Sequence, residues 1–206
     1  MASRLFIPLR SLLLACLLSA SALADDGPGT QAVRRANDSV KALLEQKAEP
    51  GSAAEKRRAS QISVELEGFL DVNELGERAL GQHLERFRPA QRKEFLTLLR
   101  DLVEANYIKA MRSNASYAVR YLTEEEQNDG SRVVATELSV QRSGRSEVMS
   151  VDYRLLKRGE QWRAFDLVTD GVGLVENYRA QFNQIIAKEG VDGLLERMRR
   201  KKVQNG

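Results

Sequence analysis

Cysteine and histidine are nearly absent from this sequence, which contains one of each, Cys16 and His83, in 206 residues. A single thiol cannot form an intramolecular disulfide, and a structural zinc site takes four cysteine or histidine ligands, which the chain lacks. The G-x-S-x-G motif of serine hydrolases is also missing, and no spacing argument places the histidine beside a serine. We therefore expect no catalytic nucleophile and no metal site, and interpret His83 as a helix residue at the rim of the core.

Hydrophobic runs long enough to span a membrane are absent after residue 24. Before that point, Arg4 and Arg10 precede an apolar stretch that ends in Ala22-Leu23-Ala24, the small-x-small pattern read by signal peptidase. We predict a signal peptide over residues 1–24, cleavage after Ala24, and one domain over residues 25–206. Cleavage would remove Cys16, and a secreted chain without cysteine favours the bacterial periplasm. A lipoprotein signal ending at Cys16 is a weaker alternative, because its apolar core would be short.

A large net charge is also absent once the signal is removed. Without Arg4 and Arg10, the 32 basic residues fall to 30, against 29 acidic ones. This balance gives little support to a nucleic-acid partner. We interpret the basic run near the C-terminus as a solvated helix end, with acidic partners or anionic lipid headgroups as the alternative; it comprises Arg197, Arg199, Arg200, Lys201 and Lys202.

Helical periodicity extends over about residues 31–113. The segment that begins at Pro89 is the longest, and its apolar residues cover an arc of about 200 degrees instead of the usual value of about 100. This breadth predicts apolar neighbours on two sides, either because the helix is the centre of the core or because it lines a cavity for an apolar ligand. The four predicted segments begin near Gln31, Ala53, Val72 and Pro89.

From Tyr117 the period becomes alternating, which predicts a curved four-stranded antiparallel meander over about residues 116–169. Two helices follow over about residues 172–201, separated by Gly190. The predicted fold class is α+β, with the sheet packed against an N-terminal helical subdomain and the two C-terminal helices. Gly171-Val172-Gly173 lacks the rest of a phosphate-binding motif, so we interpret it as a bend at which strand and helix enclose an apolar wedge.

Acid–base catalysis is an alternative on such a fold, which can hold a carboxylate base beside a tyrosine donor. However, Asp152 and Asp166 alternate along their strands with apolar residues such as Tyr153 and Leu167, so both carboxylates should point away from the apolar face. We therefore expect no enzyme activity and no cofactor. A ligand-free adaptor that binds a membrane complex is a third hypothesis.

Short motifs run in order through nearly all of the predicted mature chain. They are Phe69-Leu70-Asp71-Val72, Leu80-Gly81-Gln82, Pro89-x-Gln91-Arg92-x-x-Phe95, Trp162, Asp166, Gly171-Val172-x-Leu174, Asn177-Tyr178-Arg179 and Gly190-Val191-Asp192. Together they resemble the MlaC, or toluene-tolerance, family of periplasmic phospholipid-binding proteins. That family often has Ser at the position of Gly173 and Thr at that of Arg88, departures that concern helix starts more than function.

The resemblance implies a carrier with a nuclear-transport-factor-like sheet, which holds acyl chains inside and leaves the headgroup near solvent. Such carriers move phospholipid between an outer-membrane lipoprotein complex and an inner-membrane ABC transporter complex with a membrane-anchored substrate-binding ring. They are linked to the lipid asymmetry of the outer membrane. A related branch resembles hopanoid-associated carriers, so another apolar lipid is an alternative ligand.

Side chains on the broad apolar arcs are the predicted lipid contacts. Burying about 15 methylenes at about 0.8 kcal/mol each contributes about 12 kcal/mol before entropic costs, so release into water would be very slow. Transfer then requires a partner that favours an opened carrier, and we predict that the sheet separates from the helices around Gly171 and Gly81. The predicted contacts are Leu99, Val103, Val151, Tyr153, Phe165, Leu174, Tyr178 and Phe182.

Overall fold

Helices form the first half of the chain in a computed structural model that describes residues 26–113, 117–142 and 145–205. The predicted signal peptide and its cleavage site lie outside these residues. The helices are α1 Pro28–Leu44, α2 Ala53–Phe69, α3 Val72–Leu80, the 3-10 helix η1 Gly81–Arg86, and α4 Pro89–Ser113.

Side chains that reach back to free N–H groups fix the starts of these helices. Ser52 accepts from Glu55 N at the start of α2, and Asp71 accepts from Glu74 N at the start of α3. At the start of α4, Arg88 supplies no capping side chain, but Gln91 Oε1 accepts from Arg88 N at 3.0 Å. In a capping box, the side chain three residues into the helix accepts from the N–H of the residue before the helix, and Gln91 makes this bond. The bond explains why α4 begins at Pro89 without a Thr before it.

Helix α1 begins earlier than its sequence periodicity predicts, at Pro28 instead of Gln31. The reason is a distant carboxylate: Glu124 in the sheet accepts from the N–H groups of Gly29 at 3.0 Å and Thr30 at 2.7 Å. These bonds satisfy donors that a helix leaves free in its first turn. A partner so remote in sequence leaves no local signal.

The sheet is an antiparallel meander with neighbours in chain order. Its strands are β1 Tyr117–Glu126, β2 Arg132–Arg142, β3 Arg145–Arg158, β4 Gln161–Thr169 and β5 Val172–Gly173. The sheet therefore has one more strand than the four predicted. The short strand β5 forms because the turn at Gly171, with φ of 83°, folds the chain back onto β4. Helix α5 then covers Leu174–Asn205, and its break at Gly190, with φ of 71°, confirms the predicted division into two helices.

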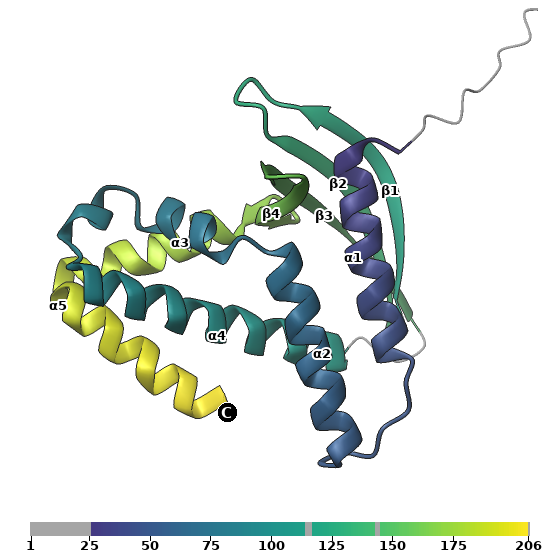
Figure 1. Cartoon of the computed structure of the whole chain (residues 1–206), viewed down its shortest axis with the longest axis horizontal. Helices are drawn as coiled ribbons and strands as arrows, with labels where there is room; N and C mark the ends of the chain where they lie inside the picture. The colour runs from purple at the N-terminus through teal and green to yellow at the C-terminus, as the bar shows by residue number, and fades with distance from the viewer. Residues whose placement is uncertain (1–25, 114–116, 143–144, 206) are drawn as a thin grey trace, which may run out of the picture.

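One face of the sheet carries the helices (Figure 1). Helix α1 contacts β1, β2 and β4, while α4 packs against α2, α3 and α5. The apolar neighbours predicted for the longest helix are thus present on several sides. The junction between α2 and α3 is tied to β4, because Asp71 N donates to Ala164 O at 2.7 Å. The core lies between this sheet face and the helices.

The basic run near the C-terminus packs back onto the fold through ion pairs. Arg199 Nε contacts Glu94 at 2.6 Å and Lys202 Nζ contacts Asp101 at 2.6 Å, both in α4. Arg197 pairs with Glu189 across the break at Gly190. These pairs favour the interpretation of the run as a helix end whose charges are largely balanced within the molecule.

Candidate functional site

The apolar sheet face and the helices over it form one continuous hydrophobic cluster. Leu174 and Tyr178 are half-buried at its edge. Phe165 is buried outside the cluster, at a bulge in β4, with the Arg78 guanidinium 4.2 Å from its ring centroid. The structure therefore brings together seven predicted lipid contacts and separates the eighth; the seven are Leu99, Val103, Val151, Tyr153, Leu174, Tyr178 and Phe182.

Two of these residues are surrounded by the protein's own side chains. Phe182 packs edge-on against Phe95 with centroids 5.3 Å apart. Leu99 lies where α4 packs closely against α3, since a Cβ at Gly76 of α3 would stand 2.9 Å from Leu99 Cδ2. Their burial fits the core-helix interpretation of the apolar arc, and their contact with lipid stays a prediction.

A small internal cavity of about 30 Å³, partly open to the surface, lies between helices α1, α2, α4 and the sheet. Of the predicted lipid contacts, Tyr153 lines it; the wall from α1 and α2 was not predicted. A signal for that wall is present in the sequence, since Asn37 interrupts the apolar stripe of Val33 and Val40 on α1. The lining residues are Ala36, Asn37, Val40, Glu65, Leu66, Phe69, Leu70, Tyr107, Tyr153 and Leu167.

Asn37 is the polar centre of this cavity and connects three tyrosines of the sheet. Its Nδ2 donates to Tyr121 OH at 3.3 Å, and its Oδ1 accepts from Tyr153 OH at 3.5 Å. Its backbone oxygen accepts from Tyr117 OH at 3.4 Å. These bonds are long and therefore weak, so a ligand that bonds to Asn37 or the tyrosines could replace them at little cost.

The tyrosines are hydrogen-bonding groups and not bases. Burial raises the pKa of Tyr153 to about 12 and that of Tyr117 to about 12. Burial also raises the pKa of Tyr107 well above its ordinary value. At neutral pH these phenols stay protonated, and two of them, Tyr107 and Tyr153, line the cavity as neutral side chains.

The two carboxylates considered for acid–base catalysis lie across the sheet from the apolar face. Asp152 pairs with Val168 and Asp166 with Arg154, in alternation with the Tyr153–Leu167 pair. Asp166 is not solvated, however: its carboxylate accepts from Val175 N at 3.0 Å and lies 3.6 Å from Arg154. Asp166 thereby caps the start of α5, and a side chain on Gly173 would meet its carboxylate at 2.9 Å.

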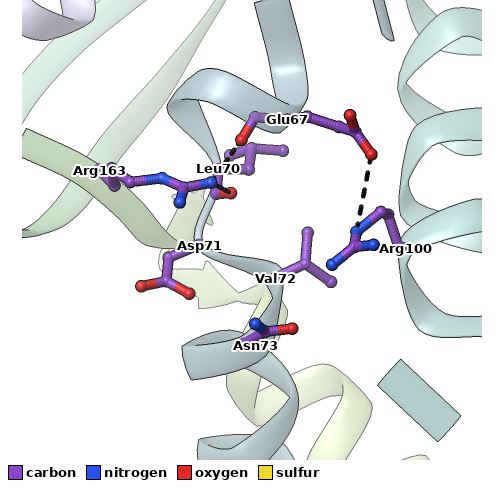
Figure 2. A pocket seen from close by; sticks show the side chains of 7 residues that line it. All are labelled: Glu67, Leu70, Asp71, Val72, Asn73, Arg100 and Arg163. Carbon is purple, nitrogen blue, oxygen red and sulfur yellow. Dashed lines mark hydrogen bonds and ion pairs between the residues drawn. The ribbon is translucent and has the colours of Figure 1, made fainter. Parts of the chain in front are cut away.

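A second, polar pocket of about 280 Å³ lies at the junction of α2 and α3 (Figure 2). Arg163 reaches from β4 to donate to the backbone oxygens of Glu67 and Leu70, the latter at 2.7 Å. Arg100 approaches Glu67 from α4 at 3.8 Å. These contacts satisfy carbonyls at the end of α2 and hold that end against the sheet.

Arg158 completes the attachment of this junction to the sheet. It contacts Asp71 at 2.7 Å and Glu74 at 2.6 Å. Burial alone would raise the pKa of Asp71, but hydrogen bonds from Arg158 and from Glu74 N lower it below its ordinary value. We call Asp71, Glu74, Arg158 and Arg163 the junction clamp.

In the part of the chain that the structure describes, no group of three or more His, Cys, Asp or Glu is placed to hold a metal ion. Among those residues, no helix is both long and apolar enough to cross a bilayer. The cavity offers apolar walls, neutral hydroxyls, one amide and the carboxylate of Glu65. This combination suits non-covalent binding of an apolar molecule that carries a polar group.

Residues 34–200 match the family model described as MlaC protein. Over 131 residues the chain is 21% identical to the intermembrane phospholipid transport system binding protein MlaC of Haemophilus influenzae. That alignment covers 63% of this chain and 61% of the relative, less than two thirds of the relative's length.

A solved structure from Ralstonia solanacearum, a phospholipid-binding protein in complex with a phospholipid, matches with a TM-score of 0.71. The identity is 23%, and the match covers 87% of this chain and 99% of the other. This likeness confirms the predicted α+β fold. Because the family model extends over residues 34–200, well over half of the sequence, the chain belongs to the MlaC protein family.

Proposed function

We propose that this chain is a periplasmic carrier that holds the acyl chains of a phospholipid between the apolar sheet face and the helices. The observation that carries the proposal is the cavity at that interface, with apolar walls from α1, α2, α4 and the sheet. Two similar proteins support it: one is named for phospholipid transport, and the other is bound to a phospholipid.

Loading requires the walls to move apart. The cavity measures about 30 Å³, whereas ligand pockets measure about 300–1,000 Å³. One buried acyl chain contributes about 12 kcal/mol before entropic costs, so an opened form must be stabilised where lipid is delivered. We propose that an outer-membrane lipoprotein complex and an inner-membrane ABC transporter complex with a membrane-anchored ring supply that stabilisation. Lipid transport between these two complexes would maintain the lipid asymmetry of the outer membrane.

Binding, and not catalysis, is the proposed activity, and phospholipid is the proposed ligand in preference to a hopanoid. The preference rests on the words phospholipid transport and phospholipid-binding in the names of the two similar proteins. No cofactor is proposed.

Replacing Val151 by Trp tests the position of the ligand. Val151 is 7% exposed within the cluster, so an indole there would fill the space that we assign to an acyl chain. Organic extraction of the purified protein should recover at least about fivefold less phospholipid than extraction of the wild type, with unchanged circular dichroism.

Val148→Trp is the matched control, because Val148 is on the same strand but 61% exposed. It should leave the lipid content unchanged. Equal lipid content in Val151→Trp and wild type would contradict the position that we assign to the acyl chain. A wild type with a filled core and no bound lipid would favour the hypothesis of a ligand-free adaptor.

A further inference from the structure

A surface groove lies directly outside the wall of the internal cavity. It measures about 380 Å³ and runs between α1, α2 and the turn that joins β3 to β4. Ala36, Glu65 and Phe69 line both this groove and the internal cavity. The two spaces are therefore separated by single side chains at the seam between α1 and α2.

Over residues 28–44 and 56–69, the seam is held by packing. No hydrogen bond or ion pair joins residues 28–44 to residues 56–69, all of which the structure describes. Each helix is instead attached elsewhere: α1 to the sheet through Glu124, and α2 to α4 through the Ser63–Glu104 hydrogen bond. The seam can thus widen without breaking polar contacts.

Three polar groups that line the groove have no hydrogen-bond or ion-pair partner among the residues that the structure describes. Among the arginine side chains that the structure describes, all except Arg35 and Arg57 contact an acid, a carbonyl or a ring nitrogen. Arg35 lines the groove from α1 and Glu65 lines it from α2, and neither has an ion pair within the described residues. The indole N–H of Trp162, also in the groove, has no acceptor within that part of the chain.

We propose that this groove holds the polar headgroup of the bound lipid, whose tails pass between α1 and α2 into the cavity. A phosphodiester is the anion that the Arg35 guanidinium and the Trp162 N–H would bind. The carboxylate of Glu65 suits the ammonium of a zwitterionic headgroup and repels a headgroup with net negative charge. Trp162 also fits this boundary, because its ring has an apolar body and a polar edge. The assignment rests on the proposed function and specifies phosphoethanolamine as the preferred headgroup class.

The test uses mature protein equilibrated with vesicles of equal phosphatidylethanolamine and phosphatidylglycerol, then re-isolated and extracted. Wild type should retain more phosphatidylethanolamine. Arg35→Ala should lower total retained lipid by about three- to tenfold, and Glu65→Gln should raise the share of phosphatidylglycerol by about threefold. Arg57→Ala removes the same charge from α2 outside the groove and should match the wild type.

The remaining outcomes separate this proposal from the proposed function. Wild-type lipid content and headgroup ratio in both Arg35→Ala and Glu65→Gln would overturn the headgroup site and leave the carrier standing. A wild type that retains no lipid would overturn both. Glycerophosphoethanolamine, which lacks acyl chains, should not be retained on gel filtration; retention that depends on Arg35 would assign the groove to a soluble phosphodiester and contradict the lipid placement.

Discussion

Residues of the central cluster divide into those that pack the fold and those that face the cavity. Leu99 and Phe95 are fully buried among helix side chains. Tyr153 lines the cavity and shares Asn37 with Tyr121 and Tyr117. This division predicts that substitutions in the two groups affect different properties, stability in the first and lipid content in the second.

Leu99→Ala tests the packing group. Removing a fully buried leucine side chain should lower the free energy of unfolding by about 2–5 kcal/mol, because it loses apolar burial and leaves a void beside Gly76. Urea unfolding followed by circular dichroism measures the change. The control is Val64→Ala, which is 66% exposed and should stay within about 0.5 kcal/mol of wild type. A loss below about 1 kcal/mol for Leu99→Ala would show that the site is not tightly packed.

Sequence periodicity predicted which apolar residues are buried, but not which of them border a cavity. Val103 and Val151 carry the same signal as Leu99, since all three occupy apolar positions of regular elements. Whether space remains beside a side chain depends on how helices and sheet meet, which is set by tertiary contacts. Asn37 was detectable as an amide in an apolar stripe, whereas Glu124 as the cap of α1 was not, because the two lie far apart in sequence.

At the scale of elements, the junction clamp decides how the α2–α3 turn is held against the sheet. Asp71 caps α3 through Glu74 N, bonds to Ala164 O through its own N–H, and pairs with Arg158. Three attachments at one residue hold this turn against β4, so separation of the sheet from the helices at this point requires that they break.

Acid should weaken this clamp. The pKa of Asp71 is lowered in the folded protein, so its carboxylate contributes stability above its unfolded pKa of about 4, and that contribution disappears as pH falls through the lower folded value. We expect the urea midpoint of wild type to fall between about pH 5 and pH 2 more steeply than that of Asp71→Asn. Asp38→Asn, an exposed α1 position, is the comparison. Parallel profiles for wild type and Asp71→Asn would contradict the role of this ion pair.

Element boundaries were predictable where the signal is local. Ser52, Asp71 and Gly190 all act within a few residues of the helix ends that they set. The short strand β5 was missed, because two residues leave no alternating pattern and pair only after Gly171 has turned the chain. Phe165 was assigned to the apolar face by simple alternation, which the bulge in β4 interrupts.

At the scale of the whole molecule, lipid loading requires relative movement of the sheet and the helices. The apolar surfaces meet around a cavity of about 30 Å³, which is too small for an acyl chain until they separate. Separation around Gly81 and Gly171 stays a prediction; both residues have positive φ, 50° and 83°, in turns that border the sheet and α3.

Linking the α2–α3 turn to β4 should slow lipid exchange. Leu70 and Ala164 are bridge partners, and the predicted mature chain has no cysteine, so Leu70→Cys with Ala164→Cys provides one disulfide. Oxidised protein should exchange lipid with labelled vesicles at least about tenfold more slowly than reduced protein. The control pair Val119→Cys with Leu138→Cys joins β1 to β2 within the sheet and should have no effect. Equal rates for the oxidised and reduced forms of the first pair would show that this junction does not move during loading.

The proposed carrier function can be tested by the native mass of the mature protein, isolated from bacterial periplasm without detergent or delipidation. A carrier should give a species heavier than the polypeptide by the mass of one phospholipid, which collisional activation releases. A homogeneous species with the mass of the polypeptide alone would contradict the carrier function.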